Sequence, residues 1–152
     1  MPVIHAAKAT VHHLHDTSFT SYASPSRGSR ELCAWRIQIP ARTPGVPHRV
    51  SREEVLYVLS GTLRATVDGQ PSEAAAGDVI LVAAGSSICV GNPADEPATA
   101  WVTTSVGFAG VLPDGSWMTP LDPVIMMNLT PAAGLDNGRS SRRPGAPTTL
   151  AW

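Results

Sequence analysis

The sequence has few cysteines, no excess of either charge and no long apolar run, and each absence narrows the class of protein. Two cysteines in 152 residues, Cys33 and Cys89, give neither a disulfide framework nor a CxxC pair, so we expect buried thiols in a reducing compartment. A formal net charge of -1, from 11 basic and 12 acidic residues, excludes the basic surface that nucleic-acid binding requires. No apolar run approaches the roughly 20 residues of a membrane-spanning helix, so we expect no membrane partner.

The chain length and the N-terminus predict one cytoplasmic domain. A chain of 152 residues can bury one sizeable core but is short for two. Its first residues lack a basic segment followed by an apolar one, so no secretory signal is predicted. We divide the chain into an N-terminal strand segment at 1–16, a barrel domain at 17–109 and a Pro/Gly-rich extension at 110–152, expected to be partly mobile.

Short β-rich segments separated by turn residues predict an all-β fold. The expected strands are 32–39, 53–61, 62–67, 78–83, 87–92 and 99–108. Turn chemistry such as Asp68-Gly69 and Asn92-Pro93 separates them. Short strands at this spacing, without a helical period, favour an antiparallel sandwich or barrel.

The hydrophobic patterns of these segments predict which faces are buried. Residues 62–67 alternate between apolar and polar side chains, so one face should contact solvent. Residues 78–83 are apolar throughout, so we expect that strand to be covered on both faces. In the segment 53–61, the odd-numbered Val55, Tyr57 and Leu59 should point outward and give an apolar outer surface.

Two spaced motifs carry more information than the strands. The first reads His48-Arg-Val50, three residues, Glu54, six residues, Gly61. The second reads Gly77, five residues, Ala83-x-Gly85, two residues, Ile88, three residues, Asn92. In both, several positions agree at once with the two motifs of the cupin family. The sequence therefore resembles a small single-domain cupin over roughly residues 17–108.

The resemblance implies a double-stranded β-helix, the jelly-roll barrel of cupins, with a ligand site inside the barrel mouth. Of the four positions that hold metal in this family, His48 and Glu54 are present, while Val50 and Ile88 stand where the family has histidines. The resemblance also implies a homodimer and a small organic molecule as partner. The metal set is incomplete.

Strand geometry supports a shared site for these positions. Residues 48 and 50 share one strand face, and Glu54, Leu56 and Val58 continue it if the chain stays extended through 51–53. If the second motif pairs across the barrel, Ile88 faces the same interior. The expected ligand pocket comprises Val50, Leu56, Val58, Ile88, Trp35 and Trp101. Its lining should be largely apolar.

Two interpretations of His48 and Glu54 remain open. One imidazole and one carboxylate are too few for the usual zinc or non-haem iron sites, so a weakly bound zinc, iron or nickel ion needs a recruited ligand, with His13 and His15 as candidates. Alternatively, the pair binds no metal and performs acid–base catalysis, because groups in an apolar interior have pKa values shifted toward neutrality.

These interpretations lead to two function classes. The first is an enzyme of small-molecule or secondary metabolism, of cyclase, isomerase, dehydratase or oxygenase type, acting on an apolar or aromatic substrate, with polyketide cyclisation among the reactions of similar cupins. The second is a non-catalytic binding or sensing protein that has lost its metal. Retention of His48 and Glu54 in register favours the enzyme.

Overall fold

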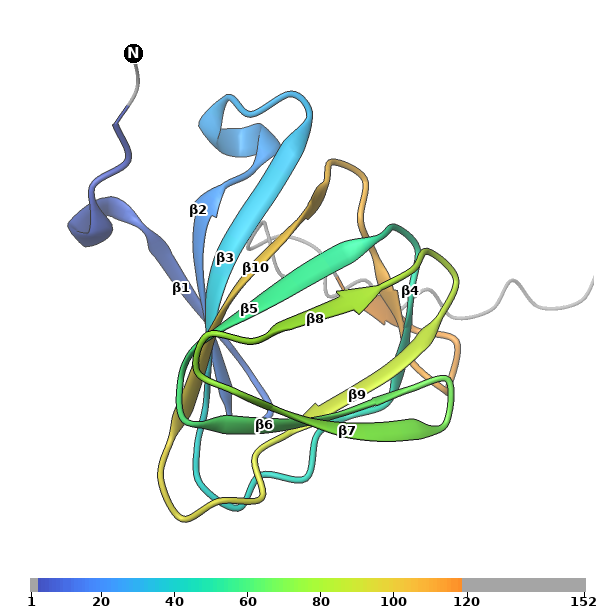
Figure 1. The fold of residues 1–152 in the computed structure, drawn as a ribbon. Helices are drawn as coiled ribbons and strands as arrows, with labels where there is room; N and C mark the ends of the chain where they lie inside the picture. The colour runs from blue at the N-terminus through green and yellow to red at the C-terminus, as the bar shows by residue number, and fades with distance from the viewer. Residues whose placement is uncertain (1–2, 119–152) are drawn as a thin grey trace, which may run out of the picture.

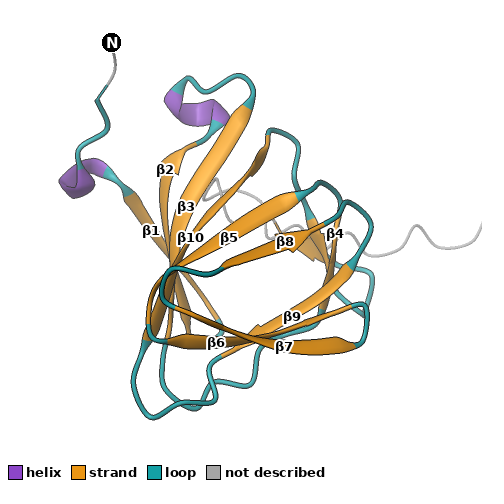
Figure 2. Cartoon of the chain, in the orientation of Figure 1, coloured by secondary structure: helices purple, strands orange, loops and turns teal. Residues whose placement is uncertain are grey.

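The computed structural model describes residues 3–118, and these form two antiparallel six-stranded sheets that face each other as a jelly-roll barrel (Figures 1 and 2). The first sheet has the order β1 (Thr10–Leu14), β2 (Thr17–Ala23), β3 (Leu32–Ile39), β10 (Ala98–Ser105), β5 (Glu54–Ser60), β8 (Val79–Val82). The second has the order β12 (Trp117–Met118), β11 (Gly110–Val111), β4 (His48–Val50), β9 (Ser87–Gly91), β6 (Thr62–Val67), β7 (Gln70–Ala75). Two single 3₁₀ turns, η1 (Ala6–Lys8) and η2 (Pro25–Arg27), flank β1 and β2. The predicted all-β fold is confirmed.

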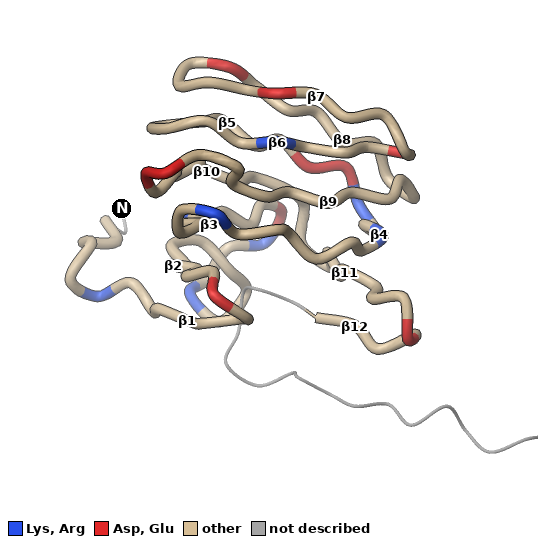
Figure 3. Tube along the Cα trace, turned by 90° about the horizontal axis from the view of Figure 1, so that it is seen from below, with Lys and Arg blue, Asp and Glu red and all other residues tan. Residues whose placement is uncertain are grey.

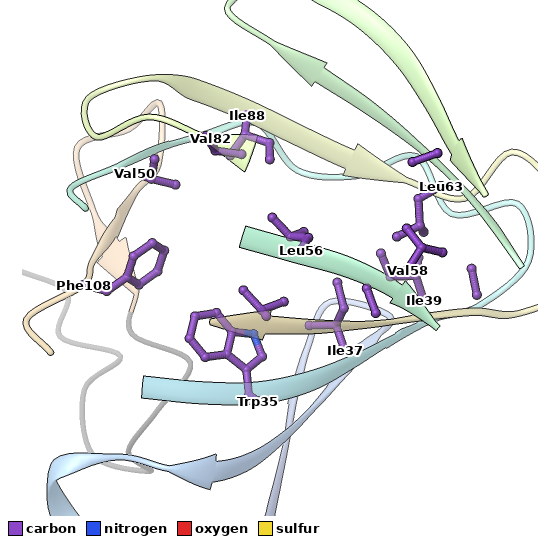
Figure 4. Close-up of a cluster of buried hydrophobic side chains, with 14 of the residues drawn as sticks. Trp35, Ile37, Ile39, Val50, Leu56, Val58, Leu63, Val82, Ile88 and Phe108 are labelled. Carbon is purple, nitrogen blue, oxygen red and sulfur yellow. The ribbon is translucent and has the colours of Figure 1, made fainter. Parts of the chain in front are cut away.

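Alternating side chains explain how each sheet divides an interior from a solvent face. In β6, Leu63 and Ala65 are buried while Arg64 is exposed, as the alternating sequence predicts. β10 alternates in the same way along its whole length. The inward-facing residues of both sheets meet in one core, which includes Trp35, Leu56 and Leu63 (Figure 4).

The strand β8 corrects one prediction, because it is not covered on both faces. Its outward residues Val79 and Leu81 are 57% and 62% exposed. β8 is the edge strand of the first sheet, paired only with β5. A wholly apolar segment is compatible both with a central strand and with an edge strand that has an exposed apolar face. The hydrophobic pattern of residues 78–83 therefore does not show which of the two it forms.

The segment from residue 48 to 58 corrects a second expectation, because it is not one extended strand. β4 ends at Val50 in the second sheet, and β5 begins at Glu54 in the first sheet. The chain bends at Ser51 and Arg52 to cross between the sheets. Glu54 therefore faces the interior from the sheet opposite His48, and the two side chains approach one space from two walls.

Two motif residues outside the site have structural roles. Gly61 has a φ of +74°, and a Cβ there would lie 2.9 Å from the Cα of Ala98, so the turn after β5 requires glycine. The side chain of Asn92 is fully buried, and its Nδ2 donates to the carbonyl oxygen of Ile39 at the end of β3 (3.2 Å) and to that of Glu96 in the following loop (2.7 Å). Both residues fix turns at the strand ends and leave the interior apolar.

The sheets continue across the expected segment boundaries. β1, from the N-terminal segment, pairs with β2, and β11, from the C-terminal extension, pairs with β4. The expected mobility of the extension concerns residues that lie mostly outside the described range. Cys33 is buried and Cys89 is half-buried, each as a thiol.

Charged residues of both signs are scattered along the trace of residues 3–118 (Figure 3). Arg64 pairs with Glu73 at 2.8 Å across β6 and β7, and Arg42 pairs with Asp95. Within the same residues, no helix has the length and apolar character needed to span a membrane.

Candidate functional site

A cavity opens between the two sheets and takes its walls from nearly every element of the barrel mouth. The volume of this cavity is about 110 Å³, several times what one water requires. β3 supplies Trp35, Ile37 and Ile39, while β4 and β5 supply His48, Glu54 and Leu56. The β1–β2 hairpin closes one side with Leu14, His15, Thr17 and Phe19. The walls are mainly apolar, with a few polar groups among them.

Glu54 is the most deeply buried charged group of this cavity. It is 4% exposed, at the first position of β5, between Val82 of β8 and Thr104 of β10. Within residues 3–118, its carboxyl group has neither an ion-pair partner nor a hydrogen bond from another side chain. Burial raises the pKa of Glu54 to about 7, because the apolar surroundings disfavour the charged form.

His48 faces the cavity from the opposite sheet with one ring nitrogen already occupied. Its Nδ1 lies 2.9 Å from the carbonyl oxygen of Val46. A carbonyl only accepts, so Nδ1 carries the proton and Nε2 of the neutral ring keeps a free lone pair. Burial lowers the pKa of His48, an effect that the bond to Val46 opposes only in part. The neutral imidazole is therefore the dominant form at neutral pH.

The backbone of Gly110 supports the His48 ring from behind. A Cβ at this position would lie 3.1 Å from Cδ2 of His48 and 3.3 Å from Cε of Met118. Because Gly110 pairs with Val50 in the neighbouring strand, the ring lies against the β11 backbone. The absence of a side chain at Gly110 leaves room for the imidazole at the cavity wall.

Burial reverses the usual order of the two pKa values, because that of Glu54 ends above that of His48. The pKa of Glu54 rises and that of His48 falls, so near neutral pH the site holds an imidazole with a free lone pair and a carboxyl group that is about half protonated. A base and an acid are thus present at once on opposite walls. This combination suits proton transfer to and from one bound molecule.

The residues present do not fit the metal site that the fold family implies. Val50 and Ile88, at the positions of the missing histidines, are 0% and 1% exposed and belong to the hydrophobic core. Among residues 3–118, no three His, Cys, Asp or Glu side chains are grouped closely enough to hold a metal ion. His15 lines the cavity mouth, whereas His13 is exposed and hydrogen-bonds Ser18 at 3.1 Å. Binding of zinc, iron or nickel stays a prediction.

The expected pocket residues fall into two groups. Leu56 and Trp35 line the cavity, whereas Val50, Val58 and Ile88 face inward but are packed within the core. Ile88 pairs with His48 across β9 and β4.

Trp101 is a correction: it does not line the cavity. It pairs with Arg36 on the outer face of the first sheet and contacts Tyr22, with ring centroids 5.2 Å apart. The inward residues of β10 are its neighbours Ala100 and Val102. The pairing register of β3 and β10 decides this, and a single strand sequence does not reveal it.

Several lining residues were missed from the sequence. Ile37 and Ile39 share strand parity with Trp35 and could have been added by that signal. Phe19, Val90 and Met118 come from distant strands, and only the tertiary fold brings them to the cavity.

Comparisons with known proteins agree with this architecture. The jelly-roll barrel with a small-molecule cavity at its mouth defines the class, and residues 35–104 match the family model described as a cupin domain. Residues 35–104 therefore form a cupin domain. No curated protein matches the sequence.

Solved structures with the same fold come from proteins described as having different functions. The polyketide cyclase RemF from Streptomyces resistomycificus aligns with a TM-score of 0.62 at 15% identity, covering 69% of this chain and 79% of that one. A putative ethanolamine utilization protein Q from Salmonella typhimurium aligns at 0.53 and 26% identity, covering 60% and 70%. A predicted oxalate decarboxylase from Thermotoga maritima aligns at 0.57 and 16% identity, covering 69% and 99%.

Proposed function

We propose that the protein is an enzyme that binds a small, largely apolar organic molecule in the cavity and moves protons on it through His48 and Glu54. The observation that carries this proposal is the buried Glu54 carboxyl group, unpaired within the described residues, opposite the half-buried imidazole of His48 in a mainly apolar space. Burying a carboxyl group without a partner is costly. A role in catalysis explains why this residue occupies the position rather than an apolar one.

The chemistry follows from the protonation states. The Nε2 lone pair of His48 accepts a proton from a C–H or O–H group of the substrate, while protonated Glu54 donates its proton to a substrate oxygen. The site is left with an imidazolium and a carboxylate. In cyclisation or isomerisation, the reverse transfers at other atoms of the rearranged substrate restore the starting state. In dehydration, the expelled water carries the proton from Glu54, and the imidazolium returns its own proton to the carboxylate.

This proton balance fits cyclisation, isomerisation or dehydration. Cyclisation is the first of these to test, because one protein of the same fold is a polyketide cyclase and an apolar cavity suits an aromatic or polyketide-like molecule. We do not extend the proposal to oxygenase chemistry, since the donor set does not fit a metal site.

A non-catalytic binding protein is the second candidate. The replacement of two family ligand positions by the buried apolar residues Val50 and Ile88 favours it. In that case, Glu54 and His48 hydrogen-bond the ligand without reacting with it.

Substitution of Glu54 and His48 after a ligand screen separates the two candidates. Small aromatic and polyketide-like compounds are first screened by thermal shift, and those that bind are then tested for turnover by mass spectrometry. Glu54→Gln and His48→Ala should each reduce turnover by about 10²–10⁴-fold while ligand binding persists. Glu53→Gln, an exposed neighbour, and His13→Gln, an exposed histidine, serve as matched controls. Turnover that persists in both site variants contradicts the catalytic proposal, and ligands that bind without turnover support the binding protein.

A further inference from the structure

The indole N–H of Trp35 is a buried donor in the cavity wall that has no partner among residues 3–118. Its Nε1 is buried and forms no hydrogen bond, and the residue as a whole is 3% exposed. An unsatisfied buried donor costs on the order of 1–3 kcal/mol. Buried donors in native proteins are nearly always paired, so this exception calls for an explanation.

A hydrogen-bond acceptor for this N–H can approach from the cavity, because the ring forms part of the cavity wall. Trp35 lines the cavity, and Figure 4 shows its nitrogen on the interior side of the ring, toward Leu56 and Ile37 in this view. Phe108 contacts the indole with centroids 5.7 Å apart and an interplanar angle of 50°. The side chain is thus held in place by its neighbours. The nitrogen has almost no accessible surface, so an oxygen of a ligand in the cavity reaches the N–H only when a neighbouring wall side chain shifts.

Trp101, one strand away, provides the contrast. Its Nε1 donates to Oγ1 of Thr103 at 3.1 Å on the outer face of the same sheet. The fold therefore satisfies an indole N–H within its own chain where the ring has no ligand to meet. At Trp35, it leaves the same group open.

We propose that Trp35 is a specificity-determining residue whose N–H donates a hydrogen bond to an acceptor oxygen of the ligand. An indole donates and never accepts, so the complementary ligand group is an acceptor, in its simplest form the carbonyl oxygen of an apolar or aromatic ketone. This inference rests on the proposed function, since it presumes a small organic ligand in the cavity. It adds the ligand class: a carbonyl compound, with the carbonyl group directed at β3.

A matched pair of probes tests the hydrogen bond separately from the cavity. Acetophenone and ethylbenzene have nearly the same shape and differ in a carbonyl group against a methylene group. The wild-type protein should bind acetophenone about 2- to 12-fold more tightly, the range expected for one net hydrogen bond. Trp35→Phe should abolish the preference but still bind ethylbenzene, whereas Trp101→Phe should retain the preference.

A spectroscopic readout keeps the test valid if Trp35→Phe does not fold. In ¹⁵N-labelled wild-type protein, the Trp35 indole resonance should move downfield with acetophenone but not with ethylbenzene, with its assignment obtained by replacing the other tryptophans in turn. Equal affinities for the two probes, or a preference that survives in Trp35→Phe, overturn the role of Trp35 alone. If neither probe binds at millimolar concentration, the proposed small-molecule cavity fails, and this inference fails with it.

Discussion

The inward-facing residues of the barrel form two sets that differ in how completely they are satisfied. The core set, which includes Val50, Leu63 and Ile88, is apolar and almost without exposed surface. The cavity set, which includes His48 and Glu54, contains polar groups whose partners are incomplete within the described chain. Of the four positions that the motif resemblance assigns to metal ligands, Val50 and Ile88 belong to the core set, and His48 and Glu54 belong to the cavity set.

The largest expected effect on stability comes from replacing two residues of the core set by potential metal ligands. Val50→His with Ile88→His places two imidazoles where the structure now packs methyl groups. Without metal, the double variant should lose about 2–6 kcal/mol of unfolding free energy, since each imidazole is left unsatisfied. Zinc should restore much of that loss, measured by urea unfolding with and without the ion.

The metal content of the same proteins gives an independent readout. After dialysis, the native protein should hold well under one equivalent of zinc, iron or nickel, and the double variant close to one. Val50→Asn with Ile88→Asn is the control, equally polar but without expected zinc rescue. A full equivalent in the native protein would contradict the incomplete set and make His15 the first residue to examine.

Truncation should affect the two sets unequally. Leu63→Ala, in the core set, should cost about 2–5 kcal/mol, because it leaves a cavity in packed surroundings. Val90→Ala, at the half-buried cavity wall, should cost about 1 kcal/mol or less, because its side chain already borders open space. Equal losses in urea unfolding would show that the cavity wall is packed as tightly as the core.

The pH dependence of stability should report the burial of Glu54. Its folded pKa of about 7 exceeds the ordinary 4.5, so the native state binds more protons than the unfolded state between these values. Stability from this group is therefore lost as pH rises from about 4.5 through 7, by up to about 3 kcal/mol. Glu54→Gln cannot ionise, so relative to wild type it should gain stability over the same window. His48, whose pKa is lowered, contributes the opposite slope below 6.5.

A parallel pH titration of both proteins by urea unfolding isolates the effect of Glu54. Glu53→Gln, at an exposed position, should follow the wild-type curve. A constant difference between Glu54→Gln and wild type from pH 4.5 to 8 would contradict the raised pKa.

The smallest expected change in folding free energy concerns the outer face of the first sheet. We expect a homodimer formed through Val55, Tyr57, Leu59, Val79 and Leu81, which lie on the outside of β5 and the edge strand β8. Leu81→Lys should convert it to a monomer in sedimentation experiments while changing the stability of the isolated fold by about 0.5 kcal/mol or less. Val11→Lys, at an exposed valine of the opposite edge, is the control. A wild-type monomer at micromolar concentration contradicts the proposal.

The sequence predicted correctly those structural properties that are determined within a single segment of the chain. The strand bounds 32–39 and 62–67 match the structure, because alternation and flanking turns are encoded within each segment. The outward direction of Tyr57 and Leu59 was also correct. These predictions needed no knowledge of neighbouring strands.

The errors and omissions concern relations between segments. The position of β8 at the edge of the sheet leaves one of its faces exposed. The pairing register of β3 and β10 places Trp101 on the outer face of the sheet. The crossing at Ser51 and Arg52 put His48 and Glu54 on opposite sheets, although both still face the interior. Nε1 of Trp35 is without a hydrogen-bond partner because no neighbouring group in the fold offers it an acceptor. The sequence of one strand does not reveal this.

The β1–β2 hairpin has a consequence for how this protein can diversify. It lines the cavity with Leu14, His15 and Phe19, yet it lies at the edge of the first sheet, where β2 pairs with β3 and β1 is the outer strand. Substitutions in the hairpin can therefore reshape one wall of the cavity while the buried core residues of the other strands remain unchanged. Ligand preference and fold are in this way carried by separable parts of one chain, so that homologues with a near-identical barrel and a different hairpin are expected to accept different molecules.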